Sequence, residues 1–369
     1  MAVLKLITAD ADTSQLSLYT TVFESSSGTV TNSTEQARTG SRSMKYSKTA
    51  SSVGLAYHTL TLDQIITGTD GVNLGFGLYI DTSVVNLDPG LNIGTCAAFL
   101  GIAGSDGYNH VILGVNAGGV LEYRTNTYAT NSSYQAAGST PVPTDEWVYI
   151  SIFCKIDLSV GVMQIKMNGV TEINFTGNTG DDGKFGATTQ DIHAFTFGIS
   201  AFGVTAGEMD RGEFFIDDLV IYDTTGSISN GHPNNVKLFT STADGDGNYA
   251  AQFTSTGANQ YQEIDDATPD GDATNISSST SGHRATVTVT NTSSTGLVSG
   301  VSLLTNAKGN GSDTLQPSVR LSSTDYDQTA YTPGTDYAWH QTPITLNPAT
   351  AARWATAAVD GIEIGWTIP

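Results

Sequence analysis

The pattern of apolar and polar positions predicts a chain built almost wholly from short β-strands. In residues 72–81, apolar side chains alternate with Asn, Gly and Asp, which is typical of a strand with one buried face. Residues 147–156 carry apolar side chains on both faces, so this segment is expected to be a central strand. Further strand signals lie near residues 97–103, 110–115 and 120–124.

One hairpin can be located from its turn. Residues 162–167 alternate cleanly, and the Asn168-Gly169 pair that follows is preferred in a two-residue type I′ turn. After the turn the alternation shifts, because a strict hairpin would place Glu172 opposite Ile165, whereas the apolar residue is Ile173. We therefore expect a bulge or a looser loop in this hairpin.

The segment 214–223 holds two adjacent carboxylates inside an otherwise apolar run, Asp217 and Asp218. Simple alternation places its apolar side chains on two faces, with Phe214, Ile216, Val220 and Tyr222 on one and Phe215, Leu219 and Ile221 on the other. A buried carboxylate needs hydrogen-bond donors, a paired charge or a metal ion. The doublet is therefore either a device that anchors the backbone or part of a cation site.

Composition divides the chain into two domains. The stretch around His232-Pro233 is rich in Gly, Pro and Asn and has few apolar anchors, which indicates a linker at residues 229–236. We therefore expect a first β-sandwich domain at 1–228 and a second, smaller β-sandwich at 237–369.

The second domain shows several alternating segments and one helical segment. The alternating segments are residues 284–290, 300–305, 317–322 and 361–368, and in the last of these the isoleucines and Trp366 face one way. The Ala-rich stretch 348–358 predicts a helix, with Asn347 as its cap and Pro348 in its first turn.

The composition supports an all-β fold and excludes two classes of partner. The chain has 369 residues with 40 glycines, and only 14% of the residues are charged. Its net charge of −21 reflects a shortage of Lys and Arg, so we expect no nucleic-acid surface. We also expect no membrane segment, since no apolar run reaches the roughly 18 residues that a spanning helix needs. The residues at the start predict no secretory signal.

Four segments together carry a resemblance to a known fold family: residues 37–46 as an early strand, the turn 145–147, the hairpin 164–169 and the run 216–222. In this order they resemble the concanavalin A-like lectin and glucanase sandwich, in the laminin-G-like and pentraxin-like branch that is frequent in tailed-phage structural proteins. The resemblance covers residues 1–225 and implies a concanavalin A-like jelly roll.

A second resemblance lies in the C-terminal part, in residues 244–248, 265–270, 300–301, 307–308 and 347–350 with Trp354 and Gly365. These segments are similar to a module that recurs in phage virion proteins. The combination implies a non-enzymatic structural protein on the particle surface, either capsid decoration or a short head or tail appendage. Its partners would be other virion proteins, and it would assemble in the host cytoplasm.

The sequence offers little for catalysis. Glucanases of the resembling sandwich carry a signature like Glu-Ile-Asp-x-x-Glu, and the nearest match, residues 263–268, ends in Thr268 instead of the second glutamate. The six histidines are scattered without metal-ligand spacing, and no Gly-x-Ser-x-Gly motif is present. We expect no catalytic residue and no required cofactor, and a glycan-degrading enzyme ranks third among the functions.

Calcium is the ion that the sequence favours as a candidate. Asp244, Asp246 and Asn248 alternate as the first half of a calcium loop would, although the downstream glutamate is missing. The same run is also a good turn sequence in its own right. Asp217 and Asp218 form the second candidate site, because members of the resembling family sometimes bind calcium at this place.

The competing function is a carbohydrate-binding module that recognises bacterial surface glycans, for example in a tail fibre. Ligand sites combine aromatic side chains with a few polar groups. The aromatic candidates near polar loops are Tyr108, Tyr123, Tyr128, Tyr134 and Trp147. The alternative is that these rings pack in the core or at its rim.

The C-terminal strand favours self-association. Ile364 and Trp366 lie close in sequence to an Ala-rich segment that carries Trp354. Together these side chains form more apolar surface than a domain of about 130 residues buries easily. Exposed apolar patches usually mark interfaces. We therefore expect a homo-oligomer, with a trimer favoured, unless both tryptophans lie in the domain core.

Overall fold

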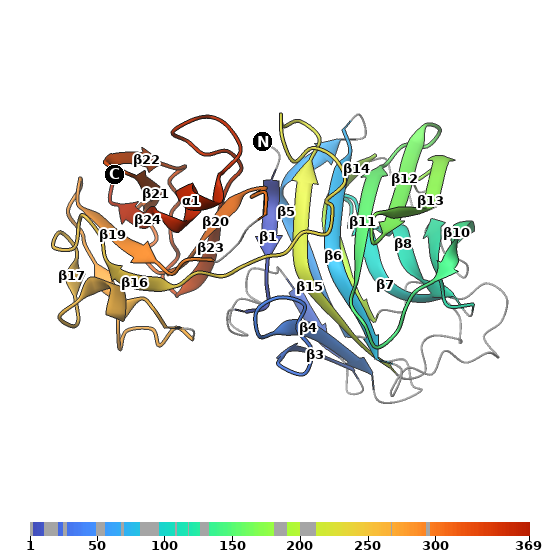
Figure 1. Cartoon of the computed structure of the whole chain (residues 1–369), viewed down its shortest axis with the longest axis horizontal. Coiled ribbons are helices and arrows are strands. Elements are labelled where there is room, and N and C mark those ends of the chain that lie inside the picture. The colour runs from blue at the N-terminus through green and yellow to red at the C-terminus, as the bar shows by residue number, and fades with distance from the viewer. Residues whose placement is uncertain are drawn as a thin grey trace. The chain divides into compact units, whose positions relative to one another are not determined.

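The structure is a computed structural model in which the chain forms two compact units, Met1–Leu238 and Phe239–Pro369 (Figure 1). The structure describes residues 3–10, 21–24, 28–48, 56–67, 70–81, 96–107, 109–116, 118–125, 133–180, 190–199, 212–266, 268–292 and 296–369.

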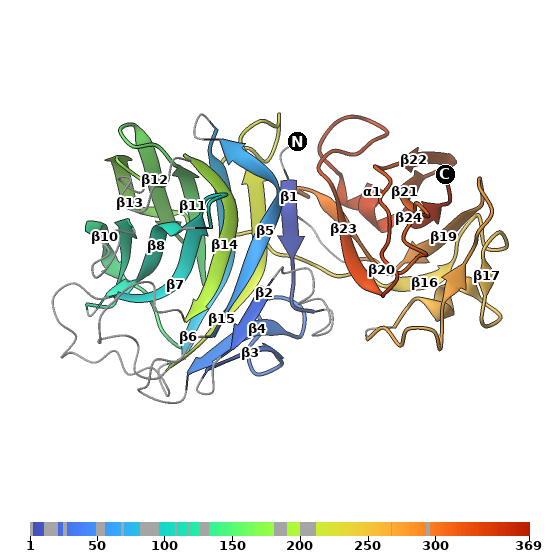
Figure 2. The same ribbon diagram turned by 180° about the vertical axis from the view of Figure 1, so that it is seen from behind.

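The first unit is a sandwich of two antiparallel sheets. Within the described ranges, sheet A has the order β13-β12-β11-β6-β15-β4-β3, with β1 also beside β15, and sheet B has the order β10-β9-β8-β7-β14-β5-β2. Figure 2 shows sheet B toward the viewer. The strands of sheet A are β1 (Val3–Ile7), β3 (Gly28–Ser33), β4 (Ser43–Lys48), β6 (Val72–Asp81), β11 (Val148–Lys155), β12 (Gly161–Met167), β13 (Val170–Gly177) and β15 (Gly212–Asp223). Those of sheet B are β2 (Thr21–Glu24), β5 (Ala56–Thr67), β7 (Cys96–Ala103), β8 (Asn109–Asn116), β9 (Val120–Thr125), β10 (Ser133–Pro141) and β14 (Asp191–Ile199).

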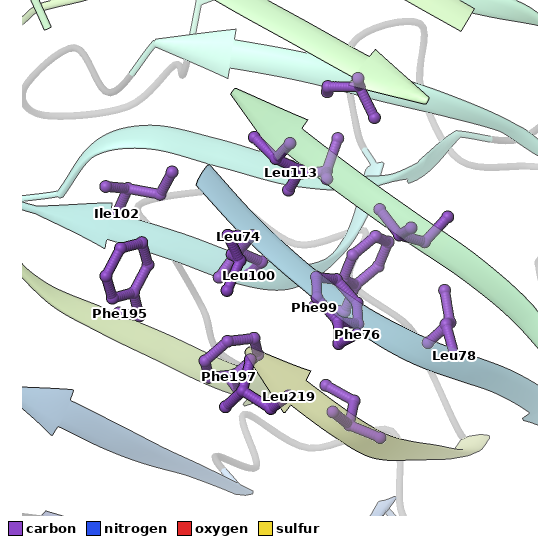
Figure 3. Packing of buried hydrophobic residues seen from close by; sticks show 14 of the residues in the cluster. Leu74, Phe76, Leu78, Phe99, Leu100, Ile102, Leu113, Phe195, Phe197 and Leu219 are labelled. Carbon is purple, nitrogen blue, oxygen red and sulfur yellow. The ribbon is translucent and has the colours of Figure 1, made fainter. Parts of the chain in front are cut away.

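The main core of this unit lies between the inner faces of the two sheets. Figure 3 shows Leu74 and Phe76 of β6 beside Phe99 of β7 and Phe197 of β14, and all four side chains are buried. The ring of Phe76 meets those of Phe99 and Phe197 edge-on, the arrangement that aromatic pairs prefer. The inward residues predicted for β6 are therefore confirmed.

The predicted irregularity of the Asn168-Gly169 hairpin is also confirmed. Both turn residues have positive φ, 50° and 84°, as a type I′ turn requires. The register shifts between Ile165 and Lys166, so that Ile165 pairs with Ile173. The bulge places Ile173, which follows the turn, on the same buried face as Ile165, which precedes it.

The predicted faces of β15 are wrong beyond Asp218. Asp218 has a φ of 53°, and the register with β6 shifts between Asp217 and Val220. This bulge adds one residue, so the alternation restarts in the opposite phase. Leu219 and Ile221 therefore point into the main core together with Phe214 and Ile216. Val220 and Tyr222 lie in a separate small cluster with Val3.

The predicted linker is not a free connection. Residues 226–238, here called the strap, lie on the outer face of sheet A, and Figure 1 shows this trace crossing in front of β6 and β15. Pro233 covers Gly75, where an added Cβ would lie 2.9 Å from the proline ring and 2.4 Å from the Tyr149 hydroxyl. The outer face of β6 is thus covered in part, and the half-buried strand predicted from alternation is buried on both sides there.

Polar contacts hold the strap along its length. The two ring nitrogens of His232 hydrogen-bond Ser151 Oγ (2.7 Å) and Gln164 Oε1 (2.6 Å), and Asn73 Nδ2 donates to the Asn230 carbonyl. At the far end, Val236 and Leu238 pack against the cluster of Val3, Val220 and Tyr222. A composition rich in Gly, Pro and Asn thus forms an irregular but packed segment.

The second unit is a smaller β-sandwich. Its five-stranded sheet has the order β16 (Ala243–Asp246), β19 (Arg284–Val289), β24 (Ile362–Thr367), β21 (Gln316–Leu321) and β22 (Thr324–Asp327). In the described residues of this unit, two further sheets pair β20 (Val301–Ala307) with β23 (Ala338–Ile344) and β17 (Thr254–Ser255) with β18 (Ile276–Ser277), and a short 3₁₀ helix spans Gln260–Glu263. The all-β sandwich class predicted from the sequence is confirmed.

The predicted helix at 348–358 is wrong for most of its length. The helix α1 spans only Thr356–Asp360. Asn347 instead closes a tight turn, because its side chain accepts from Ala349 N and its carbonyl accepts from Ala351 N, while Ala351 has a φ of 53°. A left-handed residue at this position ends any helix. In the described residues, no helix is both long and apolar enough to span a membrane.

Candidate functional site

A row of aromatic side chains crosses the outer face of sheet A beside the strap. Phe215 of β15 pairs in register with Tyr79 of β6 and, on its other side, with Lys45 of β4. The Trp147 ring lies 5.6 Å from that of Tyr79, and the Tyr79 ring lies 5.8 Å from that of Phe215. Phe215 is buried, whereas Trp147 and Tyr79 are partly exposed. The aromatic row thus presents two rings to solvent.

Small residues and the strap set the border of the aromatic row. At Gly77, an added Cβ would lie 2.4 Å from Arg38 Cδ and 3.3 Å from Trp147 Cε3. The aliphatic part of Arg38 and the edge of Trp147 therefore both rest on the bare backbone of β6. A larger residue at Gly77 would displace one of them.

Carboxylates surround the aromatic row. Burial, followed by the charges of Asp145 and Asp81, raises the pKa of Tyr79 above its usual value. On the other side, the Lys45 ammonium lies 5.6 Å from the Phe215 ring and binds Glu213 (2.8 Å) and Glu35 (2.7 Å). Burial works against the charged ammonium, but these two hydrogen bonds raise the pKa of Lys45. The surroundings of the rings are therefore acidic, and the lysine is already paired.

The aromatic row was only partly visible in the sequence. Trp147 was a candidate, whereas Tyr79 and Phe215 were not. Both missed residues occupy positions where a simple alternating strand would carry polar side chains facing solvent. An aromatic ring at such an outward position was the signal that could have found them.

The Asp217–Asp218 doublet serves as a structural anchor in this structure. Asp217 accepts hydrogen bonds from the backbone N–H groups of Arg38 (2.9 Å), Thr39 (3.1 Å) and Asp218 (2.8 Å). Asp218 accepts from Thr39 Oγ1 and from Leu238 N (2.7 Å), and it forms an ion pair with the Arg38 guanidinium. All four carboxylate oxygens thus meet protein donors, as the backbone-anchoring alternative predicts.

Arg38 is the centre of this anchor. Its guanidinium binds Asp218, Asn235 Oδ1 and the Val236 carbonyl (2.7 Å), and it stacks over the Tyr149 ring at 4.8 Å. It therefore joins the bulge of β15 to the strap. Burial, and then the charge of Asp218, raises the pKa of Asp217 to about 7, against the opposing hydrogen bonds from the backbone.

The calcium candidate formed by Asp244, Asp246 and Asn248 does not bring its ligands together. Asp244 accepts from Thr288 Oγ1 (2.7 Å), Asp246 accepts from Tyr261 N (2.8 Å), and the backbone N–H of Asn248 donates to Glu363 (2.9 Å). The run begins in β16 and passes into a turn at Asn248, and its groups bind different neighbours. Within the described part of the chain, no group of three or more His, Cys, Asp or Glu side chains is arranged to hold a metal ion.

The other aromatic candidates have different outcomes. Tyr108 and Tyr128 lie outside the described residues. Tyr123 cannot contact a surface ligand, because it is fully buried in the core and its ring packs edge-on against Phe175. It occupies an inward position of β9, so the prediction that it binds ligand is wrong.

Sheet B carries a polar cluster that the sequence reasoning did not identify. On the outer face of β9, Arg124 forms a buried ion pair with Glu122, which also accepts from Asn116 Nδ2 (3.1 Å). Tyr134 of β10 pairs in register with Arg124 and is 58% exposed. In the sequence, this cluster was indicated by two opposite charges, Glu122 and Arg124, placed two residues apart in an otherwise apolar strand.

The proposed interface residues lie inside the second unit. Trp354 is 2% exposed and donates from Nε1 to the Ile344 carbonyl, and Trp366 is 8% exposed and donates to Thr305 Oγ1. Ile364 is partly buried and packs against both core clusters of this unit. The prediction that these side chains form an exposed patch is wrong, because the unit supplies both indoles with apolar neighbours and hydrogen-bond acceptors.

No sequence-family model matches the chain, and no curated protein matches it. Several solved structures are similar to it in part. An endo-β-1,4-glucuronan lyase from the fungus Trichoderma reesei is 12% identical, with 55% of this chain and 90% of that chain covered and a TM-score of 0.39. An alginate lyase from Aplysia kurodai is 17% identical, with 52% and 86% covered and a TM-score of 0.35. A carbohydrate-binding module from Bacillus subtilis is 8% identical, with 53% and 95% covered and a TM-score of 0.30. Likenesses this distant carry no argument about function.

Proposed function

We propose that this protein is a non-enzymatic surface component of a tailed-phage particle and that it binds glycans through the aromatic row of sheet A. The observation that carries the binding proposal is the pair of partly exposed rings, Trp147 and Tyr79, with carboxylates beside them. The particle assignment is supported by the resemblance of the two sequence parts to tailed-phage virion proteins.

The chemistry of the row suits a sugar. A pyranose ring presents C–H groups on its faces and hydroxyl groups at its edge. Aromatic rings offer large apolar area at a small cost in conformational entropy, and carboxylate oxygens accept hydrogen bonds from hydroxyls. Trp147 and Tyr79 can supply the first contact, and Asp81 and Asp145 are the acceptors close to Tyr79.

The position of the row suits rigid recognition. Tyr79 and Phe215 stand on central strands of sheet A, and Trp147 directly precedes β11. Sites on strands hold their side chains more rigidly than sites on long loops, which reduces the ordering cost of binding.

A glycan array tests this function. The full chain should bind at least one bacterial glycan, and Trp147→Ala should abolish the signal. Tyr134→Ala is the matched control, since it removes an exposed aromatic ring from the other sheet and should keep the signal. Loss of binding in the control but not in Trp147→Ala would move the site to sheet B. Shortening of the bound glycan during prolonged incubation would contradict the non-enzymatic assignment.

The homo-oligomer stays a prediction of the sequence. The three residues that motivated it lie in or against the cores of the second unit, so it has no named surface. Light scattering of the full chain at micromolar concentration measures its mass directly.

A further inference from the structure

We infer that the aromatic row selects uncharged glycans and rejects polyuronates. This inference rests on the proposed glycan binding, and it adds the chemical class of the ligand. It follows from the signs of the charges that the structure places around the rings.

The negative charges lie close to Tyr79. Asp81 follows Tyr79 by two residues on β6, and the backbone N–H of Asp145 donates to the carbonyl of Ile80 (2.9 Å). Burial, followed by the charges of these two carboxylates, raises the pKa of Tyr79. On the side of Phe215, Glu213 pairs in register with Asp81, and both Glu213 and Glu35 bind Lys45. A glycan that stacks on Trp147 and Tyr79 would therefore have carboxylates next to its edge groups.

In the part of the chain that the structure describes, the two cations next to the row, Lys45 and Arg38, are already paired. The ammonium of Lys45 is shared by two glutamates, so its charge is more than balanced locally. Arg38 lies over Gly77 at the border of the row, and its guanidinium is paired with Asp218 and hydrogen-bonded to the strap. Binding an anionic sugar through either cation would require an existing ion pair to break, which leaves a carboxylate unpaired.

The whole chain strengthens the same preference. Its net charge of −21 produces a negative potential that lowers the local concentration of a polyanion and slows its approach. Uncharged hydroxyl groups meet no such penalty, and they can donate hydrogen bonds to the carboxylates. The site is thus complementary to sugars whose C6 group is a hydroxymethyl and not a carboxylate.

The test compares one glycan in two oxidation states, with the full chain. The first ligand is the uncharged glycan that gives the strongest array signal, and the second is the same glycan after oxidation of its C6 hydroxymethyl groups to carboxylates. Calorimetry at low salt should show at least about tenfold weaker binding of the oxidised form. The difference in affinity should shrink in about 1 M salt, because the Debye length there is roughly 3 Å and charges farther apart than this are largely screened.

Two variants locate the source of the selectivity. Asp81→Asn and Asp145→Asn each remove one carboxylate next to Tyr79, so each should reduce the ratio between the affinities for the two ligands. A salt-independent ratio that neither variant changes would show that shape, and not charge, decides the selectivity.

The outcomes separate this inference from the proposed function. If the strongest Trp147-dependent ligand on the array is a polyuronate, or if the oxidised glycan binds as well as the uncharged one, the inference is overturned while glycan binding stands. If no glycan shows Trp147-dependent binding, the proposed function falls and the inference falls with it.

Discussion

Two halves of one sheet face can be compared in the first unit. Around Gly75, the outer face of sheet A is covered by the strap, with Pro233 against the backbone and His232 hydrogen-bonded to two strands. Around Tyr79, the same face carries an aromatic row with two partly exposed rings. The covered half uses its polar groups for stability, whereas the rings of the other half remain available to a ligand. The boundary between them is Arg38, which rests on Gly77.

The largest expected effect comes from breaking the anchor of the strap. Arg38→Ala leaves the buried carboxylate of Asp218 without its ion-pair partner, so we expect a loss of about 3–5 kcal/mol in the free energy of unfolding. The matched control is Arg353→Ala, which removes an exposed arginine and should cost less than about 0.5 kcal/mol. Denaturant titration measures both losses. Equal stability of the two variants would contradict the anchoring role of Arg38.

The next effect tests how closely the strap lies on β6. In Gly75→Ala, the new methyl group meets the Tyr149 hydroxyl and Pro233, so we expect a loss of about 1–3 kcal/mol. Gly231→Ala is the control within the strap itself, because an added Cβ there has no atom within 4 Å. Thermal unfolding of both variants gives the comparison. The close contact would be disproved by a Gly75→Ala protein as stable as the control.

A smaller effect on stability is expected in the uncovered half. Trp147 is partly exposed, so Trp147→Ala should reduce the free energy of unfolding by only about 1 kcal/mol while glycan binding is lost. Denaturant titration and a binding assay on the same sample distinguish the two roles. A loss as large as that of Arg38→Ala would assign the aromatic row to structure instead of binding.

The smallest effect is a pH dependence confined to the strap. Burial, and then Lys166, lowers the pKa of His232 to about 4. Because this is below the unfolded value of 6.5, the neutral form of His232 stabilises the folded state above pH 6.5, and this contribution is lost as pH falls toward 4. The contribution is small, because His232 is partly exposed and solvent screens its interactions. His232→Gln should flatten the pH profile of thermal unfolding between these values. An unchanged slope would exclude His232 as its source.

The sequence predicted what depends on neighbours along the chain. The alternation of residues 162–167 and the Asn168-Gly169 turn are local signals, and the structure confirms the hairpin together with its bulge. The strands of the second unit near 284–290 and 361–368 were found for the same reason. In each case the pattern of apolar residues is sufficient to fix which face is buried.

The features that the sequence did not predict depend on contacts between residues far apart in the chain. The left-handed backbone of Asp218, which reverses the phase of β15, goes with hydrogen bonds to the distant residues Arg38 and Thr39. The strap has the composition of a linker, and its packing depends on Gly75, more than 150 positions earlier. Likewise, the aromatic row combines residues of β6 and β15 with Trp147, which precedes β11, and only Trp147 was recognised from a local motif.

Oxidative footprinting of side chains with and without saturating uncharged glycan tests the central claim most directly. The ligand should protect Trp147 and Tyr79 of the aromatic row from oxidation, and the reactivity of exposed Tyr134 on sheet B should not change. Protection of Tyr134 with unchanged reactivity of Trp147 and Tyr79 would contradict the assignment of the uncovered half of sheet A as the glycan-binding site.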